Sequence, residues 1–195
     1  MMYLPVVKKY LIKVLILWGN TKMLQYKREP LEENEISDLR KGCKGFEEEL
    51  TINVLLETGM RVSELANLTE DKISWQRSCI SLIGKGDRRR VIPMSNITRF
   101  YLTQLFAHEK KFPLAIRTIE KYVKIAADRA RITKKVSPHV LRHTFAVCYI
   151  HRGGNIRALQ AILGHSSITT TDIYLNYSGA RVIEDFQKIW NNPTS

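Results

Sequence analysis

Four side chains with chemical potential lie close together near the C-terminal end of the sequence. Within the segment from Pro138 to Tyr177 these are His139, Arg142, His165 and Tyr174. His139 and Arg142 are three positions apart, so they share one face if this segment is helical. Tyr174 follows His165 by nine positions. Basic groups, an imidazole and a phenol that converge on one place suit an anionic phosphodiester.

Two further basic residues lie upstream at turns. Arg61 follows the turn-forming Gly59 and begins a short helix, although a plain surface arginine fits the same pattern. Lys85 lies in a Gly-Lys-Gly-Asp turn between two β-like runs, 79–83 and 89–93, which indicates a β-hairpin. This turn is either a solvated basic turn or one that delivers Lys85 into a groove. Three more cations follow it: Arg88, Arg89 and Arg90.

The overall charge indicates a polyanionic partner. The 195 residues include 31 Lys and Arg against 19 Asp and Glu, a formal net charge of +12. Such an excess favours nucleic acid, the alternative being charge spread over the surface for solubility. With 44% hydrophobic and 26% charged residues, the composition is that of a globular protein.

Motifs for several other chemistries are missing from the sequence. The GKGD turn lacks the spacing of a P-loop, and the HxxxH pair His139/His143 lacks the glutamate of a zinc-protease motif. The three cysteines form no CxxC pair, so we predict neither a disulfide framework nor a zinc ribbon, and a reducing compartment fits. We therefore expect no metal and no cofactor.

Hydrophobic periodicity predicts the elements that position these residues. Residues 3–18 read as an amphipathic helix that needs a partner surface, with a membrane-surface helix as the alternative. Residues 25–30 read as a linker, which gives an N-terminal segment 1–27 and a domain 28–195. Helices are predicted at 31–41, 46–58, 95–111 (solvent-facing), 113–131, 138–152, 156–163 and 180–190. Lys121 and Lys124 lie beside the apolar stripe of the 113–131 helix, for solvation or for phosphate contact.

Four motifs occur in one order: TGMRVSEL, LIGKGDRRRVIP, SPHVLRHTFA and LGHSSITTTDIY. In this combination the chain resembles the catalytic domain of the tyrosine recombinases, the Xer-like and phage-integrase-like group, over residues 31–190. The resemblance implies a mainly α fold with a small antiparallel β-hairpin or sheet (α+β), like that of type IB topoisomerases. It also implies a separate helical core-binding domain, of which residues 1–27 resemble a remnant.

The resemblance assigns roles residue by residue. Arg61 matches the first catalytic arginine, Lys85 the hairpin lysine, and His139 with Arg142 the HxxR pair. His165 matches the position filled by histidine or tryptophan, and Tyr174 matches the nucleophile, with Tyr177 as a nearby alternative. Contact with DNA is expected from Arg88, Arg89, Arg90, Lys121 and Lys124.

The implied function is that of a site-specific DNA recombinase or integrase of a mobile element or chromosome, acting through a 3′-phosphotyrosyl intermediate. The implied partners are double-stranded DNA and further copies of the chain, a tetramer on paired sites assembled through the 180–190 helix. No membrane partner is expected, and the location is cytoplasmic and nucleoid-associated. A type IB topoisomerase-like nicking and resealing activity and a non-recombining DNA-binding regulator stay open as alternatives.

Overall fold

The structure, a computed structural model, describes residues 29–83 and 89–164. The expected N-terminal helix, Lys85, Arg88, His165, Tyr174, Tyr177 and the 180–190 helix lie outside the described residues. The helices are α2 (Glu33–Lys41), α3 (Phe46–Thr58), α4 (Val62–Ala66), α5 (Asn96–Phe106), α6 (Ile116–Arg129), α7 (Pro138–His151) and α8 (Ile156–Leu163), with a 3₁₀ turn η1 (Glu70–Lys72). The strands are β1 (Ile73–Ser74), β2 (Cys79–Ile83) and β3 (Arg89–Pro93).

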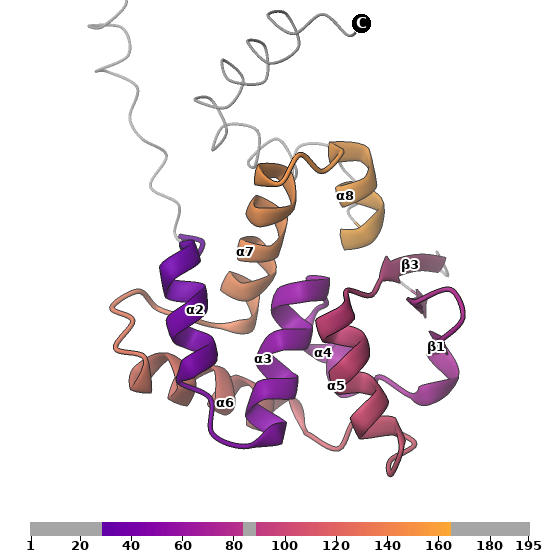
Figure 1. The fold of residues 1–195 in the computed structure, drawn as a ribbon, viewed down its shortest axis with the longest axis horizontal. Coiled ribbons are helices and arrows are strands. Elements are labelled where there is room, and N and C mark those ends of the chain that lie inside the picture. The colour runs from indigo at the N-terminus through magenta and orange to yellow at the C-terminus, as the bar shows by residue number, and fades with distance from the viewer. Residues whose placement is uncertain (1–28, 84–88, 165–195) are drawn as a thin grey trace, which may run out of the picture.

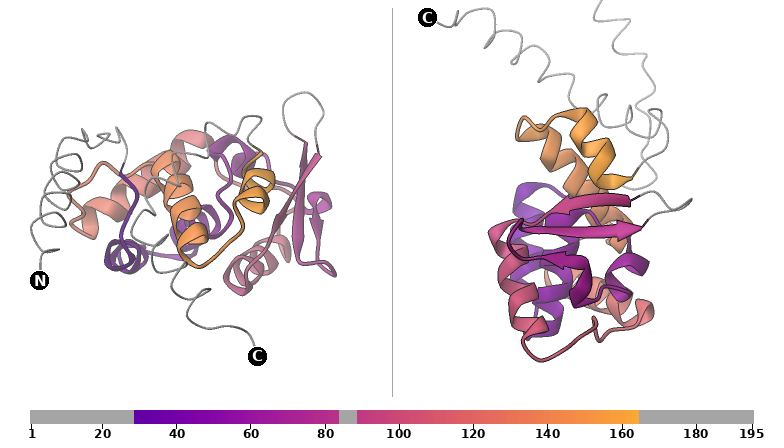
Figure 2. Two further views of the ribbon diagram at one scale, coloured as in Figure 1. Left: turned by 90° about the horizontal axis from the view of Figure 1, so that it is seen from above. Right: turned by 90° about the vertical axis from the view of Figure 1, so that its right-hand side faces the viewer.

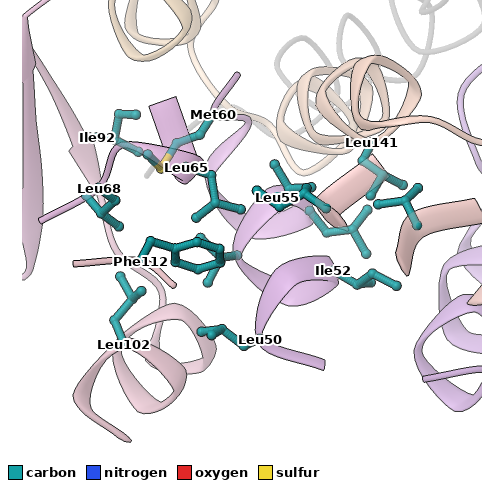
Figure 3. Close-up of a cluster of buried hydrophobic side chains, with 14 of the residues drawn as sticks. Leu50, Ile52, Leu55, Met60, Leu65, Leu68, Ile92, Leu102, Phe112 and Leu141 are labelled. Atoms are coloured by element: carbon teal, nitrogen blue, oxygen red, sulfur yellow. The ribbon is translucent and has the colours of Figure 1, made fainter. Parts of the chain in front are cut away.

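Helix α3 is the centre of the helical body, packed against α5, α6 and α7 (Figure 1). Its sequence FEEELTINVLLET keeps no polar stripe after the first turn, which is typical of a helix that is covered on all sides. Leu50, Ile52 and Leu55 are fully buried, and they join Leu65, Leu102 and Phe112 in one hydrophobic cluster (Figure 3). The C-terminal end of α3, and the residues that follow it, are therefore fixed in position by the hydrophobic core.

A small antiparallel sheet lies to one side of the helices, in the order β1-β2-β3 (Figure 2). Strand β2 pairs with β3 so that Ile80 faces Ile92 and Leu82 faces Arg90. Burial alternates along both strands, and the inward face consists of these four residues. Helix α8 packs against β3, which brings the end of α8 to this sheet.

The C-terminal part of the described chain is built from α7 and α8. Ser137 caps α7 by accepting from the backbone N–H of Val140, and Pro138 occupies the first turn, where its missing N–H is not needed. Asn155 caps α8 in the same way, and Gly164 ends it in the left-handed conformation. The backbone N–H of Leu31 donates to Oγ1 of Thr144 at 2.9 Å, which ties the start of the described chain to α7.

The predicted mainly α fold with a small antiparallel sheet is confirmed. The prediction that the helix after residue 95 faces solvent is wrong, because Leu102, Leu105 and Phe106 are buried on the side of α5 that packs against α3. Strand β1 was not predicted, since two residues are too short for a periodic signal. Among the described residues, no helix combines the length and hydrophobicity needed to cross a lipid bilayer.

Gly59 allows a prediction of stability. It has φ of +61°, and a Cβ there would lie 2.4 Å from Cδ1 of Phe145 on α7. Gly153 has φ of +83° but no atom within 4 Å of the same position, so it is a matched control for backbone strain alone. We expect Gly153→Ala to lower the free energy of unfolding by about 1 kcal/mol, and Gly59→Ala by about 3 kcal/mol because overpacking adds to the strain. Urea unfolding measures both; equal losses would mean that Phe145 moves aside without cost.

Candidate functional site

The ends of α3 and α8 meet at one arginine. Arg142 is on α7 and is only 8% exposed. Its Nη1 donates to the carbonyl oxygen of Gly59, just after α3, and its Nη2 donates to that of Leu163, the last residue of α8, at 2.7 Å. Both acceptors are neutral backbone groups at helix C-termini, where carbonyls lack partners within the helix. Arg142 is therefore fixed in place by the fold itself.

Arg61, two residues after Gly59, is held by a carboxylate instead of by carbonyl groups. It occupies the N-cap position of α4, and Glu64 is the third residue of that helix. One oxygen of Glu64 accepts from the backbone N–H of Arg61 at 2.7 Å, and the other accepts from Nη1 of its side chain at 3.0 Å. The Arg61 side chain nevertheless stays 41% exposed. The backbone N–H and Nη1 of Arg61 are thus held by Glu64, while the rest of the side chain is accessible to a ligand.

Glu64 also holds Arg90 of β3. Nη2 of Arg90 donates to Oε2 of Glu64 at 2.7 Å, and only 7% of the Arg90 side chain is exposed. This corrects the expectation that Arg90 contacts DNA, because its strand position points it inward, where it is ion-paired. Arg89, the neighbouring residue, is exposed on the opposite face of the same strand.

The charge state of Glu64 follows from these contacts. Burial by itself raises the pKa of the Glu64 carboxyl, but the hydrogen bonds from Arg90 and from the Arg61 backbone, and the nearby positive charge of Arg90, outweigh burial. The pKa of Glu64 therefore lies below its ordinary value, and the group is an anion at neutral pH. Three arginines and one carboxylate leave this region with two net positive charges.

The remaining predicted site residues within the described part of the chain lie on the surface. His139 is exposed in the first turn of α7, one turn before Arg142. Its neighbour His143 is half-buried, and burial lowers the pKa of His143, which keeps it neutral at pH 7. Lys121 and Lys124 are exposed on α6, and neither makes an ion pair with another described residue. The structure thus joins Arg61 and Arg142 through the end of α3, while no hydrogen bond links His139 to either within the described residues.

Sequence reasoning missed the part that Glu64 plays in holding Arg61, and it missed the inward position of Arg90. Glu64 follows Arg61 by three positions, and a glutamate at the third position of a helix commonly accepts from the N-cap backbone N–H. The inward position of Arg90 follows from the two-residue period of β3, since it lies two residues before the buried Ile92. Both signals were present in the sequence.

The helical fold with its small antiparallel sheet is that of a catalytic domain of the integrase and recombinase class. The model of the phage integrase family matches residues 29–181, and the chain belongs to that family. It is 33% identical over 165 residues to tyrosine recombinase XerD of Staphylococcus aureus, which covers 76% of this chain and 56% of the relative. The chain thus spans little more than half the length of that relative.

Solved structures agree with this family. The crystal structure of XerA recombinase matches with a TM-score of 0.73 and 31% identity, covering 87% of this chain and 67% of that one. The catalytic domain of bacteriophage HP1 integrase matches with a TM-score of 0.64 and 29% identity, covering 87% of this chain and all of that one. The predicted resemblance to tyrosine recombinases is confirmed.

The ion pairs of Glu64 make stability depend on pH. Because the folded pKa of Glu64 is lowered, its contribution is fully present above the unfolded pKa of about 4.3 and is lost as pH falls through the folded value. We expect Glu64→Gln to lower the free energy of unfolding by about 2 kcal/mol at neutral pH. The difference from the wild-type chain should shrink as the pH falls below about 4.3, the pKa of the unfolded group.

Urea unfolding at several pH values measures this difference. Glu70→Gln is the control, because Glu70 makes a 2.7 Å ion pair with Lys110, whose side chain is 89% exposed. Such a surface pair contributes about 0.5 kcal/mol or less. A Glu64→Gln deficit that does not shrink as the pH falls below about 4.3 would contradict the assigned role.

Proposed function

We propose that this chain cleaves and rejoins DNA strands as a site-specific recombinase or integrase, with Tyr174 as the nucleophile. The observation that carries the proposal is the anchoring of Arg61 and Arg142 at the end of α3, one by Glu64 and the other by two helix-terminal carbonyls. Membership of the phage integrase family, and a match to the recombinase XerD, support the same reaction.

In the proposed reaction each of these side chains has one role at the phosphodiester. The Tyr174 phenol attacks phosphorus, an O–P bond forms, and the bond to the 5′-oxygen breaks. His139 takes the phenolic proton, and Lys85 supplies a proton to the departing 5′-oxygen. Arg61, Arg142 and His165 stabilise the negative charge on the nonbridging oxygens. The product is a 3′-phosphotyrosyl link, which a 5′-hydroxyl can attack in turn to rejoin a strand. This route uses no metal and no nucleotide.

The proposed DNA surface combines α6 with the β2–β3 hairpin. Lys121 and Lys124 on α6 and Arg89 on β3 are exposed, and they supply charge without a carboxylate partner among the described residues. Arg88, which directly precedes β3 in the sequence, adds one more positive charge to this set. The net charge of +12 favours binding to the phosphate backbone over the whole surface.

Assembly and location are part of the same proposal. The chain acts as a homo-tetramer on paired DNA sites, held together by the 180–190 helix, and it works in the cytoplasm on the nucleoid. The spacing of Val182, Ile183, Phe186 and Trp190 in the sequence predicts an apolar face if that segment is helical. Deleting residues 179–195 should weaken assembly on two-site DNA more than binding to a single site; equal losses in a gel-shift titration would contradict this role.

Covalent trapping on DNA from the native locus tests the cleavage reaction. With a nicked suicide substrate, we expect the wild-type chain and Tyr177→Phe to form a protein–DNA adduct and Tyr174→Phe to form none, because only Tyr174 lies at the nucleophile position. Gel electrophoresis under denaturing conditions detects the adduct, and peptide mapping locates it. The proposed function fails if the wild-type chain forms no adduct. The assignment of the nucleophile fails if Tyr174→Phe is trapped and Tyr177→Phe is not.

The salt dependence of DNA binding tests the α6 surface. Each lysine that neutralises a phosphate contributes about 0.9 to the slope of log K against log salt, so Lys121→Ala with Lys124→Ala should reduce the slope by about 1.8. The control pair is Lys41→Ala with Lys110→Ala, which removes the same formal charge from lysines already paired with Asp38 and Glu70. Equal slopes for both double variants would remove α6 from the DNA surface.

A further inference from the structure

Arg90 occupies a place where a charge is costly. It points to the inward face of the sheet, opposite Leu82 and on the same side as Ile80 and Ile92. A buried guanidinium is unfavourable unless it is paired and hydrogen-bonded. A leucine or valine would fit the alternation of β3 better. The presence of an arginine here therefore calls for a specific partner.

That partner is the carboxylate that orients Arg61. Oε2 of Glu64 accepts both from Nη2 of Arg90 and from the backbone N–H of Arg61, each at 2.7 Å. With Oε2 held from two sides, Oε1 is directed to Nη1 of Arg61 at 3.0 Å. The direction of the Arg61 side chain thus depends on a carboxylate that Arg90 fixes from the core side.

The same arginine also packs beneath the end of α8. A Cβ on Gly164 would lie 2.9 Å from both Cδ and Nη1 of Arg90, so the absence of a side chain at Gly164 makes room for Arg90. Gly164 directly follows Leu163, whose carbonyl oxygen accepts from Arg142. Arg90 therefore lies between the carboxylate of Glu64, which orients Arg61, and the end of α8, which binds Arg142.

We propose that Arg90 is a positioning residue that sets the geometry of Arg61 through Glu64 and supports the α8 terminus that binds Arg142. Its catalytic consequence rests on the proposed strand-cleavage function. A lysine cannot replace it fully, because one ammonium group does not reproduce a planar fork that donates to Glu64 and lies close to Gly164. The role differs from DNA contact, which acts on affinity rather than on the rate of the bound complex.

The experiment compares Arg90→Met with Arg77→Met. Both remove one charge and keep an unbranched stem, but Arg77 is exposed in the turn between β1 and β2. At saturating suicide substrate, we expect Arg90→Met to slow single-turnover adduct formation by about tenfold or more with DNA affinity changed by less than about threefold. Arg90→Lys should recover part of the rate. Arg77→Met should leave the saturated rate nearly unchanged, because Arg77 contacts neither Glu64 nor the end of α8 among the described residues.

A double-mutant cycle shows whether Arg90 acts through Glu64. In a Glu64→Gln background, Arg90→Met should slow adduct formation by no more than about twofold further, because residues in one hydrogen-bonded network are not additive. Additive losses, or equal rate losses for Arg90→Met and Arg77→Met, would overturn the proposal. A rate loss that matches the fraction of unfolded chain, measured by urea unfolding of the same variants, would also overturn it and leave Arg90 as packing alone.

The same cycle measured by unfolding without DNA separates this inference from the proposed function. Coupling between Arg90 and Glu64 in the free chain, together with a wild-type chain that forms no adduct, would overturn the cleavage function and with it the catalytic role of Arg90. A wild-type chain that forms the adduct but shows no coupling in either measurement would overturn only the inference about Arg90.

Discussion

The carboxylate of Glu64 is the one negative charge on which the arrangement of Arg61 and Arg90 depends. Two guanidinium groups in a partly buried region repel each other more strongly than they would in water, because the effective dielectric is lower. Glu64 lies between them and accepts hydrogen bonds with both of its oxygens. It thereby offsets the repulsion, orients the exposed arginine and gives the buried arginine the partner that its position requires. Strand β3 and helix α4, which are distant in sequence, are joined by this group.

Arg142 is held by a different principle. Among the described residues, it donates to the carbonyl oxygens of Gly59 and Leu163, at the C-terminal ends of α3 and α8. Helix C-termini carry partial negative charge and unsatisfied carbonyl groups, so a cation there stabilises both helices. Because these two acceptors are neutral, they do not cancel the positive charge as a carboxylate would. The hydrophobic core holds α3 in position, and with it Gly59 at the end of that helix. The carbonyl oxygen of Gly59 in turn positions the guanidinium of Arg142.

The sequence was sufficient to predict most of the regular elements of the described chain. Helix α3 and strands β2 and β3 begin and end where periodicity predicted, because their apolar patterns are dense and their ends carry glycine or turn residues. The environment of the arginines was not predicted. The run Arg88-Arg89-Arg90 reads as uniformly basic, yet the two-residue period of the strand exposes Arg89 and buries Arg90. A pair such as Glu64 and Arg90, 26 positions apart, is decided by how α4 and β3 pack, which local sequence does not determine.

The two arginines assigned to the phosphate differ in a way that suits the proposed reaction. Attack of a phenolate on a phosphodiester adds a second negative charge at phosphorus, and the cluster of Arg61, Arg90, Arg142 and Glu64 offers two net positive charges. Arg142, almost fully buried, is a fixed charge whose position was set during folding, so it needs no reorganisation when charge develops. Arg61, 41% exposed but anchored at its backbone and at one Nη atom, is open to an incoming phosphate. A buried charge and an accessible one can coexist here because each has hydrogen-bond acceptors within the protein. Glu64 accepts from Arg61, and the carbonyl oxygens at the ends of α3 and α8 accept from Arg142.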